Sequence, residues 1–295
     1  MAFKREDYRD LYPFKSNYLD RGENRYHYLD EGKGDAVVLV HGNPTWSFYF
    51  RHLVQALRGS NRVIVPDHMG CGLSDKPSDK DYAYTLEQRV SDLEALIDSL
   101  KIKGKITLVV HDWGGMIGLG WATRHPELIE RLVILNTSGF RMPKSKRLPF
   151  TLRMVRDVRP FGALAVRGLN AFAGLATRMA VKHPLSPRVR AGLTAPYDSW
   201  QNRIATLRFV QDIPLNPGDA SYDTVLAVEE GLKQLQHVPM FIGWGRHDFV
   251  FDDHFLAEWQ ERFPKAQVKV FEDAGHYVLE DAADRLIPMI REFIA

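Results

Sequence analysis

Residues 106–118 read ITLVVHDWGGMIG, and this stretch decides the fold. A β-branched run of strand length ends on a charged residue, and glycines then open a helix, so Asp112 is expected on a tight strand-to-helix turn. In the G-x-S-x-G form of this turn a serine is pushed out above a parallel sheet, whereas here the position holds a carboxylate. We therefore predict that Asp112 is a nucleophile. The alternative is an aspartate that only caps the next helix.

The overall composition limits the class of protein. The 295 residues are 45% apolar and 26% charged, which is ordinary for a globular protein. A net charge of +2 and the lack of a basic stripe with interleaved aromatic residues argue against nucleic-acid binding. The single cysteine, Cys71, excludes an internal disulfide. The start of the chain lacks an apolar signal region, and no uncharged apolar run reaches about 18 residues, so we expect a cytoplasmic protein.

Strand and helix patterns alternate along most of the chain. Residues 1–24 have no clear period and are expected to lead into the first strand. The expected strands are 25–32, 36–40, 62–67, 106–112, 131–136, 239–245 and 268–271, and the expected helices include 47–59, 86–101, 254–263 and 284–294. This order predicts an α/β fold with a mostly parallel twisted sheet, an antiparallel edge and helices on both faces.

The alternation breaks at Ser138. From residue 140 to about 219 there are amphipathic helical stretches and no good strand runs. This predicts a helical cap, residues 140–219, inserted after the sixth strand between two parts of one core, residues 1–139 and 220–295.

A nucleophilic carboxylate needs a base and a group that orients the base. Asp248 lies just past the strand ending at residue 245, and His276 lies just past the last strand. Because ligands of open α/β sheets bind at the carboxyl ends of the strands, we expect both residues beside Asp112. Three other histidines compete for the role of base, namely His111, His247 and His254. Only His276 follows the final strand.

The chemistry explains why the nucleophile is an aspartate. A carboxylate that attacks an sp³ carbon displaces a leaving group and forms an ester without losing a proton. Neutral His276 would then take a proton from a water that attacks the ester, while Asp248 holds the imidazole in the required tautomer. The oxyanion of this step needs donors, which the backbone N–H of Trp113 and one from the loop after residues 36–40 would supply.

Two neutral donors flank the proposed nucleophile. Asn43 lies in the loop after residues 36–40, and Trp113 directly follows Asp112. On their own they suit a tight turn and a core aromatic residue. Together with Asp112 they suit a departing anion that must be held without a full counter-charge.

Five motifs together resemble the α/β-hydrolase family, specifically the haloalkane dehalogenases: HGNPTW, PDHMGCGLSDKP, HDWGG, GRHD and DAGH. The resemblance implies a pentad of Asp112, His276, Asp248, Asn43 and Trp113. In one dehalogenase branch the acid is a glutamate after the sixth strand. Here that region reads Asn136-Thr137-Ser138, so the resemblance assigns the acid to Asp248.

The cap carries a second resemblance. Residues 195–215, APYDSWQNRIATLRFVQDIPL, with RMPKSKRLPF before them, are similar to the third dehalogenase subfamily, a branch shared with the β-lactone decarboxylases of bacterial long-chain olefin synthesis. The resemblance implies a hydrolase that displaces halide from an apolar haloalkane through an ester on Asp112. The alternative is a cis-β-lactone decarboxylase, a lyase that uses the same pentad and expels a carboxylate.

Two further alternatives are less favoured. Epoxide hydrolases also use a nucleophilic aspartate, but their cap supplies two tyrosines, and residues 140–215 contain only Tyr197. A binding protein without turnover would not need the complete pentad.

The remaining patterns concern partners. No metal-ligand spacing and no phosphate-binding glycine loop is present, so we expect neither a metal nor a cofactor. A cap rich in Leu, Phe, Ala and Met predicts a small hydrophobic substrate. Residues 141–159 are strongly basic, and apolar residues 161–181 follow. We favour a solvated face and a core face of helices here. Self-association or a pathway partner at the cap stays open, and peripheral membrane contact is less favoured.

Overall fold

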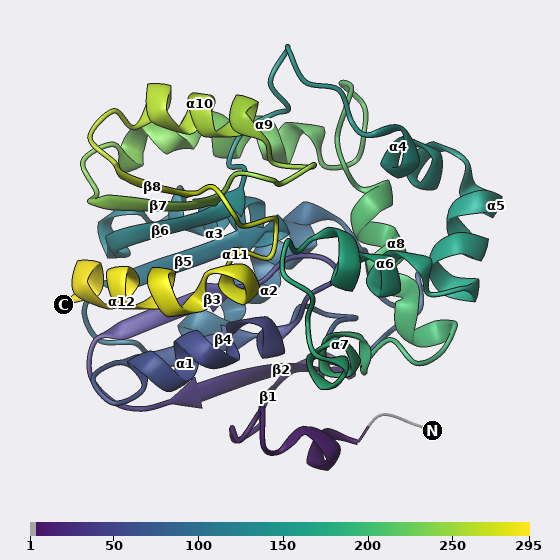
Figure 1. The fold of residues 1–295 in the computed structure, drawn as a ribbon, viewed down its shortest axis with the longest axis horizontal. Helices are drawn as coiled ribbons and strands as arrows, with labels where there is room; N and C mark the ends of the chain where they lie inside the picture. Colours follow the sequence, from purple (N-terminus) through teal and green to yellow (C-terminus); the bar gives the residue numbers. More distant parts are fainter. Residues whose placement is uncertain (1–3) are drawn as a thin grey trace.

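The computed structural model describes residues 4–295, which form one eight-stranded sheet with helices on both faces (Figure 1). The strand order is β1-β2-β4-β3-β5-β6-β7-β8. Strand β2 pairs antiparallel with both β1 and β4, and all other pairs are parallel. The prediction of a mostly parallel sheet with an antiparallel edge is therefore confirmed. The strands are β1 (Asn17–Arg21), β2 (Asn24–Glu31), β3 (Ala36–Val40), β4 (Arg62–Pro66), β5 (Ile106–Asp112), β6 (Ile129–Thr137), β7 (Met240–Gly245) and β8 (Gln267–Phe271).

Two segments differ from the sequence-based prediction. Strand β1 lies within the first 24 residues, where no period was recognised, because a five-residue edge strand alternates too briefly to be detected. Of that leading segment, residues 1–3 lie outside the described part of the chain. The helix expected over 47–59 is a 3₁₀ turn, Ser47–Phe50, followed by α1 (Arg51–Leu57).

Helices cover both faces of the sheet (Figure 1). One face packs against α1, α11 (Val278–Asp281) and α12 (Ala283–Ile294). The other packs against α2 (Leu86–Ser99), α3 (Trp113–Ala122), α9 (Tyr222–Gly231) and α10 (Asp253–Arg262). This layering is what a parallel sheet needs, because its strands must be buried on both sides.

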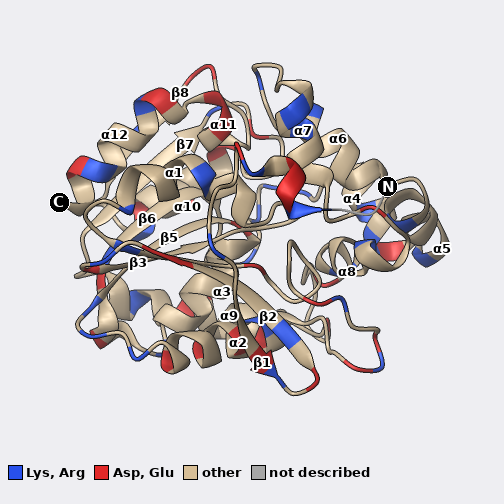
Figure 2. Cartoon of the chain, turned by 90° about the horizontal axis from the view of Figure 1, so that it is seen from below, with Lys and Arg blue, Asp and Glu red and all other residues tan. Residues whose placement is uncertain are grey.

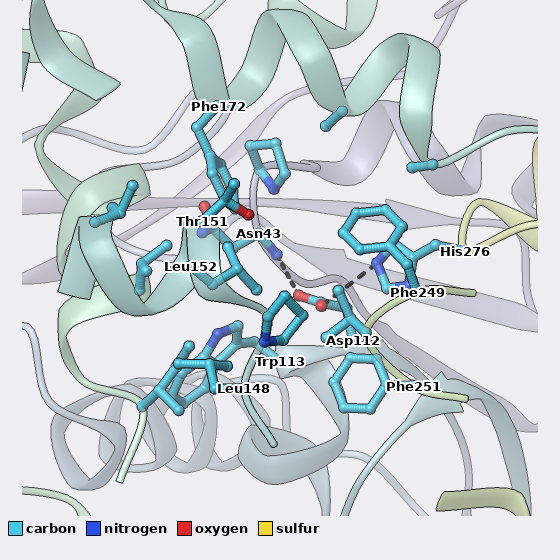
Figure 3. Close-up of a pocket in the computed structure, with 18 of the residues that line it drawn as sticks. Asn43, Asp112, Trp113, Leu148, Thr151, Leu152, Phe172, Phe249, Phe251 and His276 are labelled. Carbon is cyan, nitrogen blue, oxygen red and sulfur yellow. Dashed lines mark hydrogen bonds and ion pairs between the residues drawn. The ribbon is translucent and has the colours of Figure 1, made fainter. Parts of the chain in front are cut away.

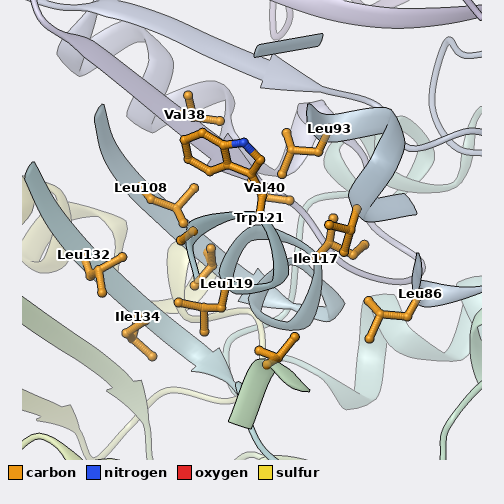
Figure 4. Packing of buried hydrophobic residues seen from close by; sticks show 14 of the residues in the cluster. Val38, Val40, Leu86, Leu93, Leu108, Ile117, Leu119, Trp121, Leu132 and Ile134 are labelled. Carbon is orange, nitrogen blue, oxygen red and sulfur yellow. The ribbon is translucent and has the colours of Figure 1, made fainter. Parts of the chain in front are cut away.

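The central strand β5 anchors the core, since all seven of its residues are buried. Leu108 and Val110 belong to the apolar cluster with α2 and α3, whereas Val109 belongs to the cluster with α1 and α12. Figure 4 shows Leu108 with Leu119 and Trp121 of α3 beside it. Burying each such side chain contributes about 1.5–3 kcal/mol, so the turn at the end of β5 rests on a rigid support.

Residues 140–219 carry helices above the carboxyl ends of the strands (Figure 1). They comprise α4 (Phe150–Asp157), α5 (Arg159–Gly162), a π-helical turn (Ala163–Gly168), α6 (Ala171–Met179), α7 (Pro187–Thr194) and α8 (Ile204–Gln211). We call residues 140–219 the cap. Within residues 4–295, none of the helices combines the length and the apolar character that crossing a bilayer requires.

Candidate active site

Asp112 occupies the turn between β5 and α3 in a conformation that few residues adopt. Its φ is +52° and its ψ is −130°. A Cβ at Gly114 would collide with the Val40 carbonyl, so only glycine fits after this turn. The Thr137 hydroxyl donates a hydrogen bond to the Asp112 carbonyl and fixes the turn to β6. Among the described residues the Asp112 side chain makes no capping hydrogen bond to α3, so helix capping does not explain this residue.

The Asp112 carboxylate instead points to two strand ends (Figure 3). Its Oδ1 accepts a 2.7 Å hydrogen bond from the backbone N–H of Asn43, in the loop after β3. Its Oδ2 lies 3.4 Å from Nε2 of His276. A Cβ at Gly42 would overlap the Asp112 side chain, so glycine is required for this close approach. The structure thus places one loop N–H on the oxygen where an oxyanion would form.

The structure brings the three predicted members of the triad, Asp112, His276 and Asp248, together. Nδ1 of His276 lies 2.6 Å from Oδ2 of Asp248, and all three side chains are buried. The backbone N–H groups of Val250 and Phe251 donate to Oδ1 of Asp248 at 2.7 and 3.0 Å. Both oxygens of the Asp248 carboxylate are therefore held, and the imidazole has one fixed orientation.

Asn136 is a positioning residue that the sequence reasoning did not assign. Its side-chain amide donates to Oδ2 of Asp248 at 3.1 Å and to the Gly245 carbonyl at 3.0 Å, and its Oδ1 accepts from the Gly245 N–H at 2.7 Å. These bonds tie the end of β6 to the end of β7. The signal was available, because an asparagine stands where one dehalogenase branch has its acid.

The charges of the triad are strongly coupled. Burial raises the pKa of Asp112, but the hydrogen bond and positive charge of His276 outweigh burial and lower it overall. Burial lowers the pKa of His276, but the carboxylates of Asp248 and Asp112 more than reverse this and raise it to about 10. At neutral pH, His276 is therefore an imidazolium between two carboxylates. Forming an ester on Asp112 removes one of these negative charges, so the pKa of His276 falls.

In residues 4–295, none of the competing histidines forms a hydrogen bond or ion pair with the side chain of the proposed nucleophile. His111 is buried with its Nε2 2.9 Å from the His276 carbonyl, and burial lowers its pKa to about 3, so it stays neutral. His247 and His254 are exposed at the surface. Tyr197, the cap tyrosine, donates its hydroxyl to the Thr45 carbonyl at 3.2 Å.

The two predicted anion donors line the same cavity as Asp112. The Asn43 side-chain amide uses one hydrogen on the carbonyl of Thr206 in α8, at 3.1 Å, which leaves the second for a ligand. Behind Trp113 lies Arg89, a fully buried cation that the sequence reasoning missed. Its guanidinium stands 3.7 Å from the Phe209 ring centre and 6.0 Å from that of Trp113. The Asp212 carboxylate, 3.2 Å from the Arg89 guanidinium, balances this charge.

The cavity above Asp112 has a volume of about 360 Å³. Its walls are mainly apolar side chains of the cap, including Leu148, Leu152, Val155 and Phe172, some of which Figure 3 shows facing the carboxylate. Asn43, Asp112 and His276 are among the few polar residues of its lining. A site of this kind suits an apolar substrate with one reactive polar centre.

Within residues 4–295, no group of three or more His, Cys, Asp or Glu side chains is arranged to hold a metal ion.

Comparison with known proteins identifies the family. Residues 35–283 match the family model described as the alpha/beta hydrolase fold. The chain belongs to the α/β-hydrolase family. This match spans the elbow turn, the cap and all members of the triad.

This α/β-hydrolase is similar to decarboxylases in sequence and to a dehalogenase in structure. A cis-3-alkyl-4-alkyloxetan-2-one decarboxylase from Shewanella oneidensis is 55% identical over 285 residues, covering 96% of this chain and 89% of the relative. A decarboxylase of the same name from Xanthomonas campestris pv. campestris is 47% identical, covering 90% and 91%. Among solved structures, the haloalkane dehalogenase DatA from Agrobacterium tumefaciens C58 superposes with a TM-score of 0.84 at 25% identity, covering 95% of this chain and 96% of that one.

Proposed function

We propose that this enzyme is a cis-β-lactone decarboxylase, a lyase that converts a 3,4-dialkyl β-lactone to an alkene and carbon dioxide. The observation that carries the proposal is the 55% identity to a cis-3-alkyl-4-alkyloxetan-2-one decarboxylase along 96% of this chain. Dehalogenation was the first expectation from the sequence, and decarboxylation the alternative. The comparisons support the alternative better, because a haloalkane dehalogenase from Mycobacterium marinum is 34% identical to this chain, against 55% and 47% for the two decarboxylases.

In the first step, an oxygen of Asp112 attacks C4 of the lactone ring. The C4–O bond breaks with inversion, an ester forms between Asp112 and C4, and the ring oxygen leaves as part of a carboxylate on C3. Asn43 and Trp113 are donors placed to receive this anion, as they would be for a halide. The step consumes no water and releases no proton.

In the second step, the C3–carboxyl bond breaks and carbon dioxide leaves. Its electron pair forms the C3=C4 double bond, while the C4–O bond to Asp112 breaks and regenerates the carboxylate. Inversion at C4 followed by anti elimination keeps the two alkyl groups on the same side, so a cis lactone gives a cis alkene. His276, held as an imidazolium next to Asp112, stabilises the returning carboxylate.

A second candidate is the haloalkane dehalogenase reaction, which the likeness to DatA favours. There the ester on Asp112 is hydrolysed, and His276 must first lose its proton to act as a base. The two reactions therefore share the first step and differ in the second.

The test is a side-by-side assay of one enzyme preparation. A cis-β-lactone with long alkyl arms is assayed for alkene and carbon dioxide, and brominated alkanes of matched length are assayed for bromide. We expect alkene formation to exceed bromide release by at least about 10³-fold in kcat/KM, because binding and leaving-group geometry are both matched to the lactone. Bromide release without alkene would overturn the proposal in favour of the dehalogenase.

The covalent step is tested in the His276→Ala variant. Without the imidazolium, the second step slows, and intact-mass analysis should show Asp112 carrying the mass of the whole lactone. A bromoalkane would instead add an alkyl group with loss of bromide. Unimpaired turnover and no adduct in this variant would contradict the role of His276.

A further inference from the structure

The exposed apolar side chains of this protein are concentrated on the cap. Of the ten large apolar side chains that are exposed in residues 4–295, eight lie between residues 150 and 200, and a ninth is Phe249. Phe150 is 76% exposed, Leu169 72% and Leu164 60%, which is high for large apolar side chains. The remaining members are Val158, Phe161, Leu175, Met179 and Trp200. We call these nine residues the apolar cap face. Exposed apolar surface gathered in this way marks an interaction site.

Part of this face frames the mouth of the cavity. Phe161, Leu175, Met179 and Phe249 are exposed to solvent and also line the cavity that contains Asp112. The cavity therefore opens through the apolar cap face. A molecule bound to this face would lie directly against the route to the nucleophile.

Basic residues accompany the apolar cap face. Residues 141–182 contain ten Lys and Arg and one acidic residue, Asp157, whereas the whole chain has 39 basic and 37 acidic residues. The rest of the chain is thus net acidic, and the positive charge is local to the cap, where Figure 2 shows blue segments around α4 and α5. Five of these basic side chains are exposed and make no ion pair with any residue of the described range, namely Lys144, Arg147, Arg159, Arg178 and Lys182.

We propose that the cap docks on the surface of an anionic lipid bilayer, with the mouth of the cavity facing the membrane. Exposed apolar side chains enter the boundary between headgroups and acyl chains, and the unpaired basic residues contact anionic headgroups. Apolar insertion and attraction to anionic lipid together determine how strongly a surface of this kind binds a bilayer. The consequence for catalysis rests on the proposed function, because a lactone with two long alkyl arms partitions into the bilayer. The docking itself does not depend on that function.

The charge pattern argues against a second copy of the chain as the occupant. A two-fold symmetric contact through the apolar cap face would bring two identical sets of basic residues together, and like charges across an interface are unfavourable. An anionic bilayer complements both the apolar and the basic character of the face.

The test is vesicle co-sedimentation at low ionic strength, with no substrate. We compare phosphatidylcholine vesicles containing about 30 mol% phosphatidylglycerol with vesicles of phosphatidylcholine alone, since anionic lipid is the predicted attraction. The apolar variant is Phe150→Ser, Leu164→Ser and Leu169→Ser, and the charge variant is Arg147→Glu, Arg159→Glu and Arg178→Glu. None of these six residues lines the cavity. The matched control is Lys103→Glu, Lys105→Glu and Lys265→Glu. These exposed lysines precede β5 and β8, at the amino-terminal ends of the strands and away from the cap.

We expect the wild type and the control to bind anionic vesicles, and each cap variant to lose binding by at least about tenfold. Turnover of a short, water-soluble lactone should be unchanged in the cap variants, while turnover of a long lactone supplied in vesicles should fall. Failure of the wild type to bind anionic vesicles would overturn the proposal. An equal loss of vesicle binding in the control variant would also overturn it. So would light scattering that shows an oligomer which does not bind vesicles and which the apolar variant dissociates. Vesicle binding without alkene formation would contradict the proposed function and leave the docking intact.

Discussion

The carboxyl-terminal rim of the sheet, which carries Asp112, Asp248 and His276, and the cap differ in how far their side chains are buried. At the rim, Asp112, His276 and Asp248 are 7%, 6% and 4% exposed, and each stands at the carboxyl end of a strand or in the loop that follows it. The cap has its own small apolar cluster, in which only five residues are buried, and a face where Leu169 is 72% exposed. The groups proposed for the chemistry therefore rest on the most rigid part of the molecule. The walls of the cavity and its mouth belong to a part with little core of its own.

The largest expected effect comes from removing the nucleophile at the rim. Asp112→Asn keeps the size of the side chain but removes the negative charge that attacks the substrate. We expect kcat to fall by at least about 10³-fold, with the fold retained by circular dichroism. Initial rates with the lactone provide the measurement. A variant that keeps more than a tenth of the wild-type rate would show that Asp112 is not the nucleophile.

The second effect concerns pH. Because the pKa of His276 is raised to about 10, the imidazolium is present at neutral pH and is lost as the pH rises through about 10. The kcat/KM for alkene formation, which follows the protonation state of the free enzyme, should therefore be level from about pH 7 to 9 and fall about tenfold per pH unit above 10. The free energy of unfolding should change with pH in the same direction. The ion pairs of His276 with the carboxylates stabilise the fold fully below about pH 6.5, which is the ordinary pKa of histidine. This stabilisation is lost as the pH rises through about 10. A rate that increases through pH 10 would indicate a histidine that acts as a base.

Substitutions in the sheet and in the cap should also differ in their effect on the free energy of unfolding. Leu108→Ala, in β5, removes a fully buried side chain and should lower the free energy of unfolding by about 2–5 kcal/mol. Leu169→Ala, on the apolar cap face, should change it by less than about 0.5 kcal/mol. Urea unfolding of both variants measures the difference. An equal loss of unfolding free energy in the two variants would mean that the Leu169 side chain is buried in solution.

The smallest effect is expected at Asn136, which touches Asp248 but does not line the cavity. Its φ of +33° makes Asn136→Gly the variant that fits the backbone. We expect kcat to fall about tenfold because Asp248 loses a donor, while KM for the lactone stays the same. A matched rise in KM would point to a general structural change instead.

The sequence predicted the rim well because its residues follow strong strand patterns. The run of residues 106–112, a turn glycine and the order of Asp248 and His276 after later strands were sufficient to bring three distant side chains together. The partner residue Asn136 was not predicted, because a hydrogen bond across two strand ends leaves no periodic pattern, and only its place in the region where one dehalogenase branch has its acid pointed to it.

The cap was harder to predict from sequence. Amphipathic patterns indicated helices over residues 140–219, but we favoured a plain division into a solvated face and a core face. The structure shows apolar residues such as Phe150 and Leu169 exposed instead. Periodicity reports which residues share a face of a helix, and it does not report whether that face has a packing partner. The unexpected exposure of this face led to the docking proposal.

The central claim is that Asp112 opens a lactone and is regenerated without water. It is tested most directly by multiple turnovers of a cis-β-lactone in H₂¹⁸O, followed by mass analysis of the peptide that contains Asp112. Hydrolysis of an ester would place oxygen from water in this carboxylate, whereas loss of carbon dioxide would not. We predict alkene in the headspace and no ¹⁸O in Asp112. Alkene-free turnover with ¹⁸O in Asp112 would contradict the account and support a hydrolase.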